Sequence, residues 1–116
     1  MNIDQLREFC LALPHTTEDV KWDNDLCFCV GGKMFAVTAL DPANAGKVSF
    51  KCTPEKFAEL TERDGIQPAA YVARYHWVTV WGTDALAERE LKELISNSYQ
   101  MVLEKLPPKV RKSLGK

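Results

Sequence analysis

The sequence predicts an α+β protein organised around an antiparallel β-sheet. Residues 26–30 and 33–40 are rich in strand-forming side chains and flank Gly31-Gly32, a pair that tolerates the positive φ values of a two-residue hairpin turn. A third strand is expected at residues 47–52, where apolar and polar side chains alternate. Apolar residues at helical spacing near both ends of the chain predict helices that pack on this sheet.

Three helices are predicted from their start and stop signals. Asn2 caps the first helix, which Pro14 ends because the residue before a proline avoids helical geometry. Thr53-Pro54 starts the second helix with a capping hydroxyl and a proline at the first helical position. The longest helix is expected at residues 86–106, and a basic tail follows at residues 109–116.

Three further segments lie between these elements. Residues 15–25 are polar and rich in side chains that bond to their own backbone, so we interpret them as a loop. Residues 76–81 are β-branched and aromatic and predict another strand, preceded by a short extended piece at residues 67–71. The face on which Trp77 and Trp81 lie is left open, because periodicity alone does not separate the outer face from the core.

Length and charge limit the class of protein. At 116 residues the chain fits a single domain, residues 1–116, with a core of ordinary size. Fifteen Lys and Arg against sixteen Asp and Glu give a net charge of −1, which counts against a dedicated nucleic-acid binder unless the cations gather on one face. No leader-like start or membrane-length apolar stretch is present in the sequence, so we expect a cytoplasmic protein without a membrane partner.

No motif in the sequence indicates catalysis. The cysteines at positions 10, 27, 29 and 52 lack a Cys-x-x-Cys spacing, so we interpret them as reduced thiols and expect no metal. His15 and His76 stand in no motif with a nucleophile or a paired carboxylate. Phosphate loops, dinucleotide fingerprints and nucleophile elbows are absent from the sequence, and we expect neither a cofactor nor an enzyme.

Aromatic and basic residues are expected on the sheet face that the helices leave open. If Val78 and Val80 face the helices, the open face carries Ser49, Lys51, Trp77, Thr79 and Trp81. Further cations lie near the ends of the strands, at Lys33, Lys47 and Arg74. Aromatic platforms with basic neighbours bind single-stranded nucleic acid, and flat aromatic faces also bind small ligands or a second subunit.

Fragments along nearly the whole chain resemble the MmcQ/YjbR family. They are Leu13-Pro14, the hairpin from Phe28 to Phe35, Lys51-Cys52-Thr53-Pro54-Glu55, His76-Trp77-Val78-Thr79-Val80, and Ser98-Tyr99 with Leu106-Pro107. The resemblance implies a CyaY-like, frataxin-like arrangement, in which the N-terminal and the long C-terminal helices pack on one face of the sheet. It also implies DNA binding through a double-wing surface of projecting hairpins, and it carries no established catalytic residues.

Two functions follow for this sequence. The first is a non-catalytic DNA-binding module that contacts phosphate through Lys33, Lys47, Lys51 and Arg74, with His76 and Trp77 matching the family at the later strand. The alternative is a small-molecule or protein-interaction module that uses Tyr71, Trp77 and Trp81. The frataxin-like fold also raises iron binding, but Asp4 and Glu8 are too sparse for an acidic ridge on the first helix. The sequence does not indicate an oligomeric state.

Overall fold

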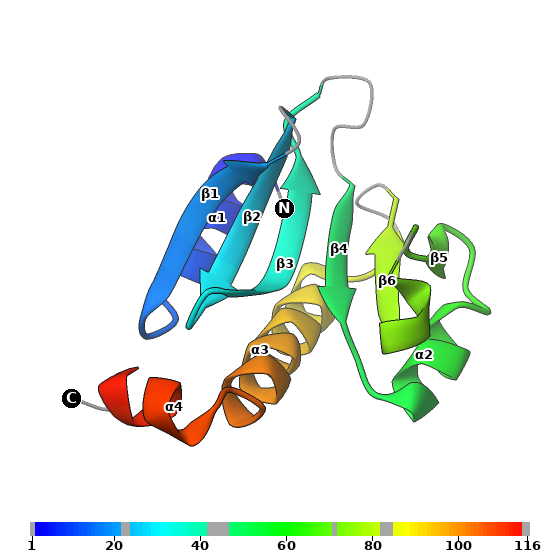
Figure 1. Cartoon of the computed structure of the whole chain (residues 1–116). Helices are drawn as coiled ribbons and strands as arrows, with labels where there is room; N and C mark the ends of the chain where they lie inside the picture. The colour runs from blue at the N-terminus through cyan, green and yellow to red at the C-terminus, as the bar shows by residue number, and fades with distance from the viewer. Residues whose placement is uncertain (1, 22–23, 42–46, 71, 82–84, 115–116) are drawn as a thin grey trace.

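The computed structural model of the chain describes residues 2–21, 24–41, 47–70, 72–81 and 85–114. Six strands form one antiparallel sheet in the order β1-β2-β3-β4-β6-β5 (Figure 1). Their bounds are β1 Thr16–Lys21, β2 Asp25–Val30, β3 Lys33–Ala39, β4 Val48–Lys51, β5 Ile66–Pro68 and β6 Trp77–Val80. The helices are α1 Ile3–Leu11, α2 Pro54–Leu60, the 3-10 turn η2 Ala73–Tyr75, α3 Glu88–Glu104 and α4 Pro108–Leu114.

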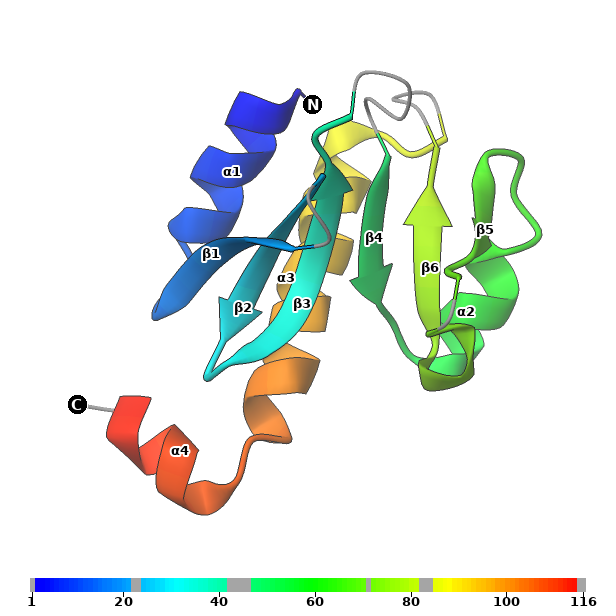
Figure 2. The ribbon, with the colours of Figure 1, turned by 45° about the horizontal axis from the view of Figure 1, so that its top comes forward.

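Helices α1 and α3 cover one face of the sheet, as the two views in Figures 1 and 2 show. The core between the layers contains Phe28, Phe35 and Phe50 from the sheet and Leu94 and Ile95 from α3. The predicted α+β class, the antiparallel sheet and the placement of the two helices on one face are therefore confirmed. The opposite face, which we call the open face, is turned toward the viewer in Figure 1.

The helices that the sequence predicted from capping residues begin where those residues stand. Asn2 accepts a hydrogen bond from the backbone N–H of Gln5 at 2.8 Å, and the Gln5 side chain accepts one from the backbone N–H of Asn2 at 3.0 Å. Thr53 caps α2 through the N–H of Lys56, and Pro54 occupies the first turn. The observed ends of these elements lie within a few residues of the expected ones, because helix and strand ends fray.

The Gly31-Gly32 hairpin turn is also confirmed, and the structure shows a second reason for its first glycine. Both glycines have positive φ, 59° for Gly31 and 82° for Gly32. A Cβ atom at Gly31 would lie 2.5 Å from Leu106 Cδ1 and 3.1 Å from Val110 Cγ1. The turn therefore packs against the junction of α3 and α4, which fixes the hairpin relative to the C-terminal helices.

One expectation was wrong. Most of the segment interpreted as a loop, residues 15–25, forms strand β1, which pairs antiparallel with β2 from Thr16↔Val30 to Lys21↔Asp25. This strand is polar because it lies at the edge of the sheet, and its Glu18 is held by Arg7 of α1 at 2.6 and 2.7 Å. The described part of the basic tail forms helix α4, which starts at Pro108. Trp22 lies outside the described residues.

Candidate functional site

The structure brings three of the predicted cations to one end of the sheet. Because neighbouring strands are antiparallel, the Gly31-Gly32 turn, the last residue of β4 and the first residue of β6 lie at the same end, which we call the hairpin end. Lys33 is exposed beside the turn, Lys51 closes β4, and Arg74 is exposed in η2 just before β6. Lys47 precedes β4 and therefore lies at the opposite end of the sheet.

A side chain of α3 holds the backbone of Lys51 at the point where the pairing of β3 with β4 ends. Strands β3 and β4 pair from Thr38↔Val48 to Ala36↔Phe50, and beyond this point the buried hydroxyl of Ser98 bridges them. Ser98 donates to the carbonyl of Phe35 at 2.6 Å and accepts from the backbone N–H of Lys51 at 3.0 Å. Lys51 also lines the hollow between α2 and α3, and its cross-strand partner in β6 is Trp77.

Burial and a neighbouring positive charge both lower the pKa of Lys51. Partial burial lowers the pKa of its ammonium group, and the nearby charge of Lys105 at the end of α3 lowers this pKa further. Two like charges held this close at a protein surface form a favourable position for an anion. Lys105 was not among the cations that the sequence singled out.

Helix α4 adds three exposed cations to the same end of the molecule. Val110 of α4 packs toward the hairpin turn, and the exposed side of this helix carries Lys109, Arg111 and Lys112. We call the seven cations together the basic surface: Lys33, Lys51, Arg74, Lys105, Lys109, Arg111 and Lys112. The sequence carried a signal for four of these cations, because residues 105–112 contain four Lys and Arg residues and no acid.

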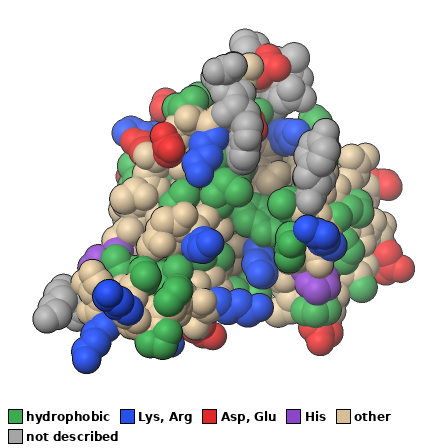
Figure 3. Space-filling model, in the orientation of Figure 1, with side chains coloured by type: hydrophobic (Ala, Val, Ile, Leu, Met, Phe, Trp, Pro, Cys, Tyr) green, Lys and Arg blue, Asp and Glu red, His purple; other side chains and the backbone are tan. Residues whose placement is uncertain are grey.

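None of the seven cations forms an ion pair with a carboxylate of the described residues. The ion pairs in this part of the chain use other cations, namely Arg7, Lys56, Arg63 and Lys92, which bind Glu18, Glu59, Glu88 and Glu90. Figure 3 shows Lys and Arg side chains spread over the open face, several of them over its lower half, and Asp and Glu at its upper left, its right margin and its lower edge. The seven cations of the basic surface thus lie at the hairpin end although the net charge of the chain is only −1.

His76 and Trp77 have structural roles at this end. His76 has a left-handed backbone, with φ 67°, and its ring packs edge-on against Phe57 with 5.6 Å between centroids. Its carbonyl accepts from the Cys52 N–H at 2.9 Å. Trp77 is only 7% exposed, so it offers little ring surface for stacking.

A groove runs along the open face, with a volume of about 600 Å³. Its floor includes the hydroxyls of Ser49 and Thr79, which are hydrogen-bonded at 2.8 Å. Most of the other lining side chains are apolar: Met34, Val37, Ala39, Ala69, Ala70, Val72 and Trp77. Trp77 and Thr79 therefore face the open side of the sheet. Of the other residues named for an aromatic face, Trp81 is 40% exposed and Tyr71 lies outside the described residues.

Asp25 and Lys47 lie where the groove meets the end of the sheet opposite the hairpin turn. The Lys47 ammonium group lies 4.8 Å from the centroid of the Trp81 ring, a cation–π contact that fixes the charge beside the groove. The groove is thus an apolar channel with two charged groups at one end.

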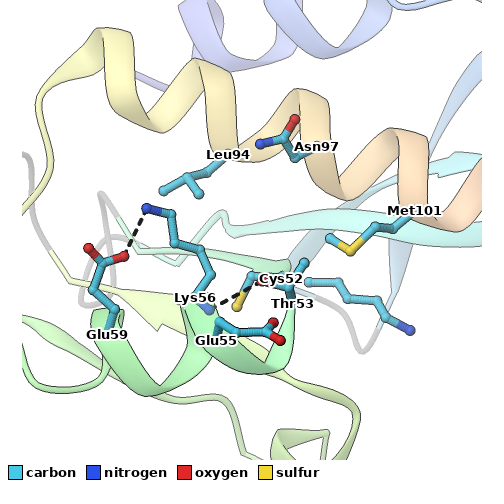
Figure 4. Close-up of a pocket in the computed structure, with 9 residues that line it drawn as sticks. Cys52, Thr53, Glu55, Lys56, Glu59, Leu94, Asn97 and Met101 are labelled. Atoms are coloured by element: carbon cyan, nitrogen blue, oxygen red, sulfur yellow. Dashed lines mark hydrogen bonds and ion pairs between the residues drawn. The ribbon is translucent and has the colours of Figure 1, made fainter.

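A second hollow, of about 490 Å³, lies between α2 and α3 (Figure 4). Lys56 and Glu59 project into it from α2 and pair with each other at 2.8 Å, and the Thr53 hydroxyl caps the helix. Asn97 and Met101 of α3 line the opposite side. Since the Lys56 and Glu59 charges are already satisfied, this hollow is a weaker candidate site than the groove.

The cysteines are buried as free thiols. Burial raises the pKa of Cys10 to about 12 and those of Cys27 and Cys52 to about 11, so the reactive thiolate is disfavoured at neutral pH. The described residues contain no group of three or more His, Cys, Asp and Glu side chains that could hold a metal ion. Among the same residues, no helix is long and apolar enough to span a membrane.

The fold and the basic surface define a class: a small α+β protein with a six-stranded antiparallel sheet, helices on one face and cations at one end. The YjbR family model matches residues 11–101. An uncharacterised protein, YjbR, of Escherichia coli K12 is 30% identical over 98% of both chains, and the corresponding protein of strain O157:H7 shows the same values. The chain therefore belongs to the YjbR family.

Two solved structures have the same fold. A Deinococcus radiodurans protein with a DUF419 domain superposes with a TM-score of 0.87 and 33% identity, over 98% of this chain and 88% of that one. A Pseudomonas syringae protein superposes with a TM-score of 0.71 and 23% identity, over 88% of this chain and 99% of that one. At 23% identity, the similarity to the Pseudomonas syringae protein shows a shared fold and nothing more.

Proposed function

We propose that this chain is a non-catalytic DNA-binding module that holds the phosphate backbone with its basic surface. The observation that carries the proposal is the gathering of seven cations at the hairpin end, none paired with a described carboxylate. Phosphate contacts from Lys and Arg supply most of the affinity of sequence-independent DNA binding, because they release condensed counterions. Such binding requires Lys and Arg to be clustered on one part of the surface, and it does not require a positive net charge of the whole chain.

The hairpin and α4 form the two arms of the proposed interface. Strand β3 ends and strand β4 begins at the end of the sheet opposite the Gly31-Gly32 turn, so the proposed interface does not include their connection. Helix α4 packs against the hairpin turn and takes the place of the second arm. Lys51 and Lys105 lie close to each other at this end, and a phosphate near both would relieve their repulsion.

Base reading is not part of the proposal. Helix α4 has seven residues, and its exposed side chains are mainly cations, which suit phosphate and not base edges. Trp77 is too buried to stack on a base. We therefore expect similar affinities for duplexes of unrelated sequence, and micromolar dissociation constants that weaken steeply with salt.

The test is a fluorescence-anisotropy titration of labelled duplex DNA with the wild-type protein and with the Lys33→Glu, Lys51→Glu double variant. The double variant should bind at least about tenfold more weakly, with a salt slope smaller by about 0.9 for each lost phosphate contact. The matched control is the Lys21→Glu, Arg89→Glu double variant, which makes the same change in net charge at two positions outside the basic surface. Equal losses in this control and in the Lys33→Glu, Lys51→Glu variant, or no binding at low salt, would refute the proposal.

A further inference from the structure

We propose that the open-face groove is a binding site for a small organic anion with an apolar body. The groove is separate from the basic surface and is not explained by DNA binding. Its volume of about 600 Å³ falls in the range of small-molecule sites, which are mostly apolar and contain a few converging polar groups. The lining has this composition.

The apolar body of the ligand is accepted by the middle of the groove. Val37 and Ala39 of β3 lie on its floor, Met34 lies toward the hairpin, and Ala69, Ala70 and Val72 line the side beyond β6. Small side chains keep the floor low, so a planar or aliphatic group can lie flat on the sheet. Burial of this apolar surface would supply the main part of the affinity.

Polar groups on the floor give the ligand an orientation. The Ser49 and Thr79 hydroxyls share one hydrogen in their 2.8 Å contact, and the second hydroxyl hydrogen has no partner among the described residues. One donor and several acceptor lone pairs therefore remain for an oxygen or nitrogen of the ligand. The buried hydroxyl of Thr79 and the half-buried hydroxyl of Ser49 cost free energy in an apolar floor unless such a partner or water bonds to them.

The charged end of the groove favours an anion. Asp25 is the cross-strand neighbour of Lys21 in β1, and strand β3 separates it from Lys47, because Ala39 pairs with Asp25 and donates its N–H to the Lys47 carbonyl at 3.4 Å. Lys47 has no carboxylate partner in the described part of the chain, and its ammonium group rests against Trp81. The positive charge of Lys47 is thus available on the far side of β3 from Asp25, and it selects a carboxylate, sulfonate or phosphate head group.

Two fluorescent probes separate the apolar body from the head group. One is 8-anilinonaphthalene-1-sulfonate, an aromatic anion, and the other is the neutral N-phenyl-1-naphthylamine. We expect saturable binding of both to the folded wild-type protein, with one probe molecule per chain. Lys47→Met should weaken sulfonate binding by about fivefold and change binding of the neutral probe by less than about twofold. Lys109→Met, which removes an exposed charge outside the groove, should leave both affinities unchanged.

A groove-filling variant tests the location. Ala70→Trp places a large side chain at an exposed position in the groove lining and should reduce binding of both probes by at least about tenfold. Ala58→Trp adds the same side chain at an exposed position of α2 and should have no effect. Circular dichroism checks the fold of each variant, and Val72→Phe replaces Ala70→Trp if the latter unfolds.

Several outcomes would overturn the assignment. They are unsaturable binding, equal binding by wild type and the groove-filling variant, or an equal loss for both probes in Lys47→Met. DNA titrations distinguish this proposal from the proposed function, because the basic surface lies at the other end of the sheet. Saturating duplex DNA should leave the dissociation constant of each probe unchanged, and a protein that fails to bind DNA can still bind the probes.

Discussion

The backbone N–H of Lys51 donates to the hydroxyl of Ser98 at 3.0 Å, and the same hydroxyl donates to the Phe35 carbonyl at 2.6 Å. A single side chain of α3 thus completes the hydrogen bonding of two strands at the point where their pairing ends. Because Lys51 is part of the basic surface, this contact couples the integrity of the sheet to the position of a proposed DNA contact.

Ser98→Ala should destabilise the protein by about 1–3 kcal/mol, because it leaves a buried N–H and a buried carbonyl without their partner. Chemical denaturation monitored by circular dichroism measures this loss. Ser96→Ala is the control, since Ser96 lies on the same helix, is half-buried and has no hydrogen bond from its side chain to a described residue. Equal stability of Ser98→Ala and Ser96→Ala would show that water replaces the bridge.

The lowered pKa of Lys51 predicts that DNA binding depends on pH. Its pKa is lowered by burial and by Lys105, so it loses its proton at a lower pH than an ordinary lysine. Affinity for duplex DNA should therefore decline as the pH rises above neutrality toward the ordinary lysine range. Lys51→Arg keeps its charge throughout this range, and anisotropy titrations should show a flatter pH profile for this variant. Identical profiles for wild type and Lys51→Arg would remove Lys51 from the interface.

The sequence predicted elements that depend on local signals. The Asn2 cap, the Gly31-Gly32 turn and the Thr53-Pro54 helix start each need only neighbouring residues, and each formed as expected. Strand β1 was missed because its polar side chains resemble those of a loop, while its strand geometry comes from pairing with β2. Edge strands carry little apolar pattern, and long-range pairing leaves no mark in a short window of sequence.

The candidate site was predictable only in part for the same reason. Lys33, Lys51 and Arg74 stood near strand ends in the sequence, but the antiparallel order determines which ends coincide, and it separates Lys47 from them. The contribution of Lys105 depends on the length of α3 and on the break at Ser98. The groove likewise depends on residues 69–72 and on strands that are distant in the sequence.

Gly31→Ala should be more destabilising than Gly32→Ala, although both glycines have positive φ. The backbone conformation costs about 1–2 kcal/mol at either position. At Gly31 the new methyl group also meets Leu106, whereas nothing lies within 4 Å of the corresponding position at Gly32. We expect an additional loss of about 1–3 kcal/mol at Gly31 from overpacking, measured by chemical denaturation.

Leu106→Ala provides the cross-check for this contact. If the clash explains the additional loss, Gly31→Ala should cost less free energy of unfolding in the Leu106→Ala background than in wild type, as a double-mutant cycle would show. An unchanged cost in that background would mean that backbone strain alone is responsible.

The contact between α1 and β1 predicts an acid-sensitive contribution to stability. A hydrogen bond from Arg7, together with its charge, lowers the pKa of Glu18 in the folded protein. A carboxylate with a lowered pKa stabilises the fold above its unfolded pKa and loses this contribution as the pH falls through its folded pKa. The stability advantage of wild type over Glu18→Gln should therefore be largest near neutral pH and shrink below about pH 4. The exposed Glu62→Gln is the control, and a difference between wild type and Glu18→Gln that stays constant down to pH 3 would contradict the ion pair.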